Sequence, residues 1–172
     1  MAAFAKYNTF IDEISKGGHN LQTAVFKCAL TNTAPTAASD TVWNTTVAPA
    51  PAAGNGYTAG GNTLTTSSAT TTAGVFKLVL ADTVFTATAG GIGPFRYVII
   101  YNSSASNKVV GYYDYASSIT LNDTETFTVD FDGSLGVFTI TYPASAPPAG
   151  ADTLSLLSTS RLTFPRSEES VI

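Results

Sequence analysis

The chain has 172 residues, of which 44% are hydrophobic and only 12% are charged, and its formal net charge is −4. This length suits one domain with a sizeable core, but the charged share is about half of that in ordinary soluble domains. The eight basic residues are scattered singly, whereas binding to nucleic acid needs clustered cations that displace counterions from phosphates, so we expect no nucleic-acid partner.

One segment near the N-terminus, YNTFIDEISKGG (residues 7–18), has the periodicity of a helix. Its apolar positions are Tyr7, Phe10, Ile11 and Ile14. Thr9 followed by Asp12 fits a capping box, and Gly17 and Gly18 are a natural stop. We therefore expect a short helix whose apolar stripe lies on another surface.

From residue 23 onward the hydrophobic period changes to two, which is typical of strands. The segment 23–32 predicts a first strand, and the Ala/Thr/Pro/Gly-rich stretch 33–74 predicts long loops and short edge strands. The later candidate strands are 75–81, 83–88, 95–102, 108–115, 118–121, 125–131 and 135–142. Asp132–Gly133 supplies a tight turn, so the last two strands are predicted to form a hairpin.

The expected fold class follows from the number and spacing of these strands. Seven or more short strands without strand–helix alternation favour an all-β, antiparallel β-sandwich, either jelly-roll or immunoglobulin-like. We expect one short N-terminal helix and an extended C-terminal arm beside it. The predicted division is 1–22 for the helix and connector, 23–142 for the sandwich, and 143–172 for a Pro/Ala-rich linker and arm.

The stretch AGGIGPFRYVIIYN (residues 89–102) has the glycine content of a phosphate-binding loop. Such a loop works because a helix begins directly after it and points backbone N–H groups at the phosphate. Here the glycines lead into FRYVIIY, which is strand sequence, and Arg96 stands where the third glycine would fall. We interpret the stretch as a turn that enters a strand.

Catalytic chemistry has few candidate residues in this sequence. His19 is the only histidine and Cys28 the only cysteine, so the two cannot form a metal cage of His and Cys. We expect His19 in a loop or cap and Cys28 in the core. The acidic residues of segment 123–132 lack the spacing of a calcium loop and indicate a solvated strand face. The sequence predicts no enzyme, no cofactor and no metal site.

Aromatic residues are the better candidates for binding. The segment GYYDYASS (111–118) clusters Tyr112, Tyr113 and Tyr115, and Trp43 stands alone in a polar stretch. Exposed Tyr and Trp anchor partner proteins or ligands. In a strand, Tyr113 and Tyr115 would share one face and Tyr112 would take the other. We expect these residues at an interface, with sugar binding as an alternative.

The cellular setting is inferred from what the sequence lacks. A single cysteine excludes an intrachain disulfide. The start MAAFAKYNTFIDEI is unlike a secretory signal, and no apolar run approaches the roughly 20 residues that span a bilayer. We expect a protein that folds in a cytoplasm and has no membrane partner.

Several successive segments of the sequence resemble a family of small structural proteins of tailed-bacteriophage virions. They are TFIDEISKGGHNL, CALTNTAP, GNGYTAGGNTLT, GPFRYVIIYN and YYDYASSITLNDTETFTVDF, and the resemblance covers about residues 4–142. It implies a β-rich capsid decoration (cement) protein on the capsid exterior, assembled in the host cytoplasm. The implied partners are the major capsid protein and further copies of the chain, as a homotrimer.

The C-terminal segment bears on how such a protein would hold its partners. PASAPPAGA (143–151) is typical of an extended spacer, and the strand-like residues beyond it include Leu162 and Phe164. This arm would either add a strand to a neighbouring subunit or form the last strand of its own domain. The alternative function is a tail, baseplate or fibre component that binds host glycans through Trp43 and the tyrosines.

Overall fold

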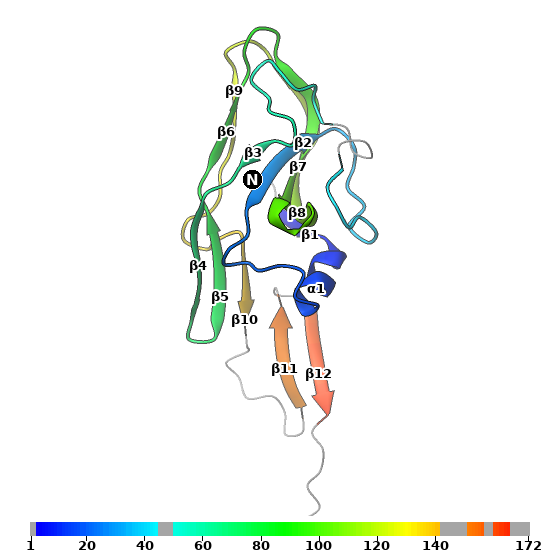
Figure 1. Ribbon diagram of the computed structural model, residues 1–172, viewed down its shortest axis with the longest axis vertical. Coiled ribbons are helices and arrows are strands. Elements are labelled where there is room, and N and C mark those ends of the chain that lie inside the picture. Colours follow the sequence, from blue (N-terminus) through cyan, green and yellow to red (C-terminus); the bar gives the residue numbers. More distant parts are fainter. Residues whose placement is uncertain (1–2, 45–49, 142–150, 157–159, 166–172) are drawn as a thin grey trace, which may run out of the picture.

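The computed structural model describes residues 3–44 and 50–141 with their side chains, and the backbone of 151–156 and 160–165. Within these residues the chain forms antiparallel sheets, one α-helix and one short 3₁₀ helix, η1 (Ser103–Ala105) (Figure 1). The prediction of an all-β, antiparallel β-sandwich with a short N-terminal helix is confirmed.

The central sheet has five strands and contains most of the buried residues. In sheet order they are β1 (Phe4–Lys6), β8 (Lys108–Leu121), β7 (Ile92–Asn102), β2 (Phe26–Thr31) and β3 (Asn62–Thr63). Val98 lies opposite Tyr113, and the next residue of β7, Ile99, lies opposite Tyr112. Because cross-strand partners share a face and successive residues alternate, the sheet separates these two pairs onto opposite faces.

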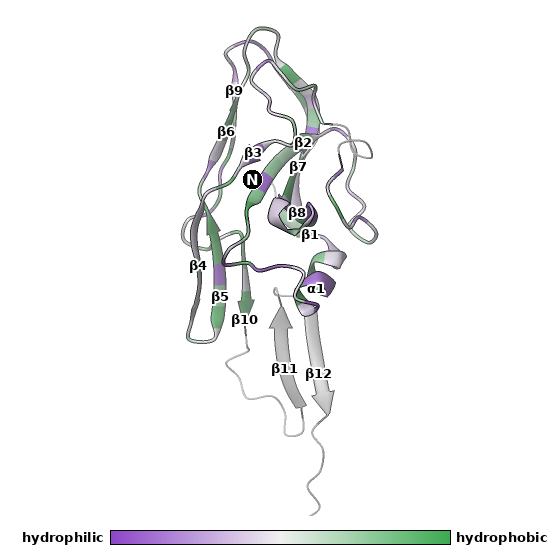
Figure 2. Ribbon diagram, in the orientation of Figure 1, coloured by the Kyte–Doolittle hydropathy of each residue, from purple (hydrophilic) through white to green (hydrophobic). Residues whose placement is uncertain are grey.

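The second sheet also has five strands and lies beside the first (Figure 1). In sheet order they are β12 (Ser160–Pro165), β11 (Ala151–Leu156), β10 (Phe138–Thr141), β5 (Val75–Leu80) and β4 (Thr66–Thr72). Strand β5 is largely hydrophobic, whereas its neighbour β4 at the sheet edge is polar (Figure 2). A two-stranded sheet of β6 (Thr83–Thr86) and β9 (Thr126–Val129) completes the fold.

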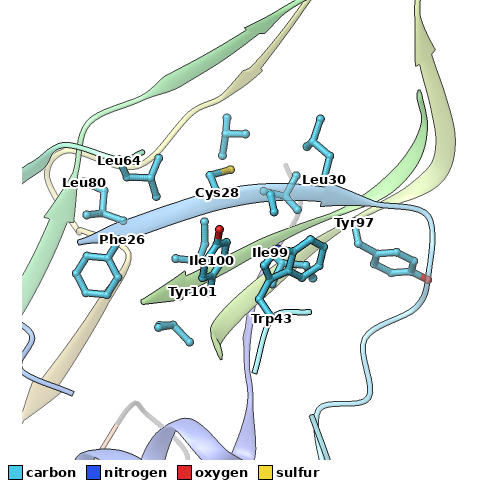
Figure 3. Close-up of a cluster of buried hydrophobic side chains, with 14 of the residues drawn as sticks. Phe26, Cys28, Leu30, Trp43, Leu64, Leu80, Tyr97, Ile99, Ile100 and Tyr101 are labelled. Atoms are coloured by element: carbon cyan, nitrogen blue, oxygen red, sulfur yellow. The ribbon is translucent and has the colours of Figure 1, made fainter. Parts of the chain in front are cut away.

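Aromatic contacts join the sheets across the core. The ring of Phe138 in β10 lies 6.4 Å from that of Phe4 in β1, measured between centroids. The ring of Phe127 in β9 meets Phe95 in β7 edge-on at 5.1 Å. Burial of such rings is the main stabilising term in a core of this size. Figure 3 shows the buried side chains that surround β2 in this cluster.

The helix α1 (Asn8–Ser15) confirms the predicted helix but corrects its N-terminal cap. Tyr7 is the N-cap residue and makes no side-chain cap hydrogen bond. The hydroxyl of Thr9 instead donates to the backbone oxygen of Asp40 at 2.7 Å, because the loop at 36–40 packs against this end of the helix. The helix ends as predicted, since Gly17 has a φ of 74°.

The predicted hairpin over residues 125–142 is wrong. Strand β9 pairs with β6 and strand β10 pairs with β5, so the two strands belong to different sheets. The carboxylate of Asp132 accepts hydrogen bonds from the backbone N–H groups of Ser134 and Leu135, at 2.8 and 2.7 Å. These bonds, with Gly136 at a φ of 78°, form a wider turn that carries the chain from one sheet to the next.

The glycine-rich stretch forms a turn at Ala89 and Gly90 that leads into a strand, as predicted, but β7 begins at Ile92, earlier than the predicted start at residue 95. Arg96 projects from this strand and forms a two-pronged ion pair with Asp114 of β8, at 2.7 and 2.8 Å. The guanidinium also lies 5.1 Å from the ring centre of Tyr97. The arginine therefore fastens two strands together, and the predicted segments 108–115 and 118–121 merge into the single strand β8.

Candidate interaction surfaces

The apolar face of α1 lies on the protein's own core. Tyr7 is 2% exposed and Phe10 is fully buried, and Ile11 and Ile14 are partly buried against the same cluster. Phe10 meets Phe138 edge-on, with ring centres 5.3 Å apart. The prediction that Tyr7 and Phe10 contact a partner is therefore corrected, because the sandwich itself covers them.

Tyr113 and Tyr115 line an apolar groove of about 160 Å³ between β8 and β9, which we call the tyrosine groove. Phe127 and Asp130 also line it, and the ring centre of Phe127 lies 5.9 Å from that of Tyr115. Tyr115 is 52% exposed, whereas burial raises the pKa of Tyr113 to about 12. This is an open surface on which an apolar side chain of a partner can rest.

Tyr112 lies on the opposite face of the same strand. Its ring centre is 5.3 Å from that of Tyr7, on the face of the central sheet that does not line the groove. The predicted division of the three tyrosines between two faces is thus confirmed.

Trp43 lines a separate polar cavity of about 500 Å³, which we call the Trp43 cavity. Its other lining residues include Lys27, Asn44, Tyr101 and Asn107. The indole stacks on Tyr101 with ring centres 5.9 Å apart and is only 6% exposed. Neither ring leaves an open face on which a sugar could stack.

Trp43 and the tyrosines do not line one common groove, as the glycan-binding alternative would require. Tyr101 shares its side of β7 with Ile99, whereas Tyr113 is the partner of Val98 on the other side. Trp43 and Cys28 likewise lie on opposite sides of β2 (Figure 3). The central sheet itself separates Trp43 from the tyrosine groove. The sequence did not indicate that Tyr101 lines the Trp43 cavity or that Phe127 lines the tyrosine groove, because only the strand register places these residues at the two sites.

Leu162 and Phe164 lie in β12, which with β11 forms what we call the C-terminal hairpin. Its register places Leu154 opposite Leu162 and Asp152 opposite Phe164. Strand β11 continues the second sheet through two register pairs with β10, Ile140–Leu156 and Thr141–Ser155. The sequence left open whether the arm adds a strand to a neighbouring subunit or to its own domain. In the structure, β11 and β12 pair within their own chain. Most of the predicted spacer (residues 143–150) lies outside the described residues.

The titratable groups of the described residues serve local structure. Cys28 is fully buried, and burial raises the pKa of its thiol. A carboxylate oxygen of Asp123 accepts a hydrogen bond from the N–H of Ala89 at 2.7 Å, and Glu125 accepts one from the N–H of Asn122 at 2.7 Å. In the part of the chain that the structure describes, no group of three His, Cys, Asp or Glu side chains could hold a metal ion.

Comparison with family models, with curated proteins and with solved structures finds no match to this chain. Over the described ranges, no helix has the length and apolar character needed to cross a membrane.

Proposed function

We propose that this protein is a non-enzymatic structural component of a bacteriophage virion, a capsid decoration protein that binds the exterior of the head shell as a homotrimer. Its partners are the major capsid protein and copies of itself. The observation that carries the proposal is the C-terminal hairpin, which extends beyond the end of β10, away from the sandwich (Figure 1).

The hairpin is amphipathic by its register. Because direct partners share a face and residues alternate, one face carries four apolar positions. They are Leu154, Leu156, Leu162 and Phe164, and Asp152 and Ser160 share this face. A two-stranded hairpin is at best marginally stable in water, and this one is joined to β10 over only two register pairs. Docking of this face on a neighbouring subunit would bury its apolar positions.

Charge and chemistry are compatible with this role. The net charge of −4 suits an outer surface better than the interior of a head filled with DNA. The tyrosine groove offers a second apolar contact. Several modest contacts engaged at once raise avidity by roughly 10²–10⁴ without any single strong contact.

Particles that carry a labelled copy of the chain test the location. Electron micrographs should show the label distributed evenly over the head. A label confined to one vertex or to the tail would contradict decoration of the shell and favour the tail or baseplate alternative.

Two neighbouring substitutions on β12 test the hairpin. Leu162→Asp places a charge on the apolar face, and we expect it to weaken attachment to heads at least about tenfold, because burying an unpaired carboxylate costs roughly 2 kcal/mol or more. Thr163→Asp adds the same charge to the opposite face and should attach normally. Co-sedimentation with heads lacking the protein measures both, and equal binding of the two variants would show that this face is not the contact.

The alternative, binding of host glycans, would depend on the polar side chains that line the Trp43 cavity, because the stacked rings of Trp43 and Tyr101 leave no open face. A glycan array probed with the intact chain tests it. Strong binding that also survives deletion of residues 143–172, together with failure to attach to heads, would replace the decoration proposal.

A further inference from the structure

His19 is buried where three elements meet. It follows α1, is 7% exposed, and its ring meets Phe10 edge-on with centres 5.0 Å apart. Asn102, the last residue of β7, faces its Nδ1. Lys108, the first residue of β8, forms an ion pair with Glu13 of α1, and Gly18 lies against this pair. His19 therefore lies between the helix and the ends of the two central strands.

The hydrogen bonds of Asn102 determine which nitrogen of His19 carries the proton. The side-chain oxygen of Asn102 accepts from the backbone N–H of Ser104 at 3.1 Å and from the Ser104 hydroxyl at 2.7 Å. A backbone N–H can only donate, so this atom must be the oxygen. The amide nitrogen of Asn102 then faces Nδ1 of His19 at 3.2 Å and donates to it. The histidine is neutral, with its proton on Nε2.

Protonation of His19 is unfavourable in this setting. A proton on Nδ1 would place this N–H opposite the side-chain N–H of Asn102. Two donors cannot bond to each other, so the hydrogen bond to Asn102 would be lost. Nε2 is buried and has no hydrogen-bond partner within the described residues. Burial is the main cause that lowers the pKa of His19, and the positive charge of Lys108 lowers it further. The negative charge of Glu13 acts in the opposite direction and raises this pKa. The packed arrangement thus accepts only the neutral ring.

We propose that His19 is an acid-sensitive latch, whose protonation releases α1 and the connector at 16–25 from the ends of β7 and β8. The latched state binds the proton more weakly than the released state, so latching is fully effective above the ordinary histidine pKa of 6.5 and weakens as the pH falls below it. At about pH 5 a single such group can shift the equilibrium between the latched and the released state by at most roughly 30-fold. The inference does not depend on the proposed virion role.

Proton NMR gives the first test, because the chain has a single histidine and its ring signals need no separation from others. In the folded protein His19 should titrate below 6.5. Titration at or above 6.5 would overturn the proposal, whatever the behaviour of any variant.

Hydrogen exchange gives the second test. Protection factors of the α1 amides, corrected for the intrinsic effect of pH, should fall between about pH 7.5 and about pH 5, by no more than roughly 30-fold, while those of β7 stay constant. His19→Gln should abolish this fall, because glutamine does not titrate. Asn102→Asp replaces the donor by an acceptor, and should raise the pKa of His19 above its value in the unmodified chain and suppress the release. Unchanged protection at the two pH values, or an equal fall in His19→Gln, would show that His19 is no latch.

Discussion

Gly61 lies where the loop before β3 crosses β2 closely. Its φ is 79°, and a Cβ added there would overlap the carbonyl oxygen of Cys28 and lie 2.7 Å from the Cα of Ala29. Both obstacles are backbone atoms in the middle of the central sheet, so neither can move aside cheaply. Glycine is required here for its conformation and for its lack of a side chain.

Gly61→Ala should therefore destabilise the fold by about 2–4 kcal/mol, from overpacking and the positive φ together. Gly133→Ala is the matched control, because nothing lies within 4 Å of its added Cβ, and it should change the free energy of unfolding by less than about 0.5 kcal/mol. Urea denaturation of both variants measures the difference. Similar stabilities would mean that the crossing is looser than the structure has it.

At the scale of elements, α1 depends on packing more than on its own propensity. It has eight residues and lacks a side-chain cap, and isolated helices shorter than about 12 residues are marginal in water. It is held by Phe10 in the core, by the ion pair of Glu13 with Lys108, and by the bond from Thr9 to the Asp40 backbone. The helix is thus a consequence of tertiary contact.

Phe10→Ala removes the central one of these contacts and should cost about 3–5 kcal/mol of unfolding free energy. The cost includes the loss of the ring contacts with His19 and Phe138. Asn8→Ala, at an exposed position of the same helix, should be nearly neutral. Circular dichroism and chemical denaturation compare the two, and a small loss for Phe10→Ala would show that the helix is not docked.

At the scale of the whole molecule, buried tyrosines connect stability to alkaline pH. Burial raises the pKa of Tyr57 to about 12, and it also raises the pKa of Tyr7. Tyr57 is held by a hydrogen bond that its hydroxyl accepts from the N–H of Leu30, at 3.1 Å. Both phenols are neutral in the folded state and ionise near pH 10 once exposed.

Alkaline pH therefore destabilises the folded state through these two phenols. The stability that the neutral phenol of Tyr57 contributes to the folded state is complete below pH 10, and it is lost as the pH rises towards the raised pKa of about 12. Each such tyrosine should lower the unfolding free energy by about 1.4 kcal/mol per pH unit in this range. Denaturation series between pH 9 and 11.5 measure how steeply the unfolding free energy falls with pH. Tyr57→Phe should reduce this slope by the contribution of one tyrosine. A slope unchanged in Tyr57→Phe would show that this phenol ionises freely in the folded state.

Local patterns in the sequence were enough to predict the class of fold and most of its elements. Alternation at 75–81 and 95–102 and the helical spacing from Tyr7 to Ile14 are local properties, and β5, β7 and α1 lie where they predict. Gly17 ended the helix as expected, because a positive φ is a property of the residue itself. Period-two patterning likewise placed Tyr113 and Tyr112 on opposite faces.

The pairing of strands and the contacts between distant side chains could not be predicted from these local patterns. The alternating runs of β9 and β10 carry no information about partners, and each pairs with a distant strand, β6 or β5. Trp43 joined Tyr101 and was separated from Tyr113, and Asn102 was placed against His19. This is because the hydrophobic period indicates whether a residue is buried, whereas register and sheet order depend on contacts between segments that lie far apart in the chain.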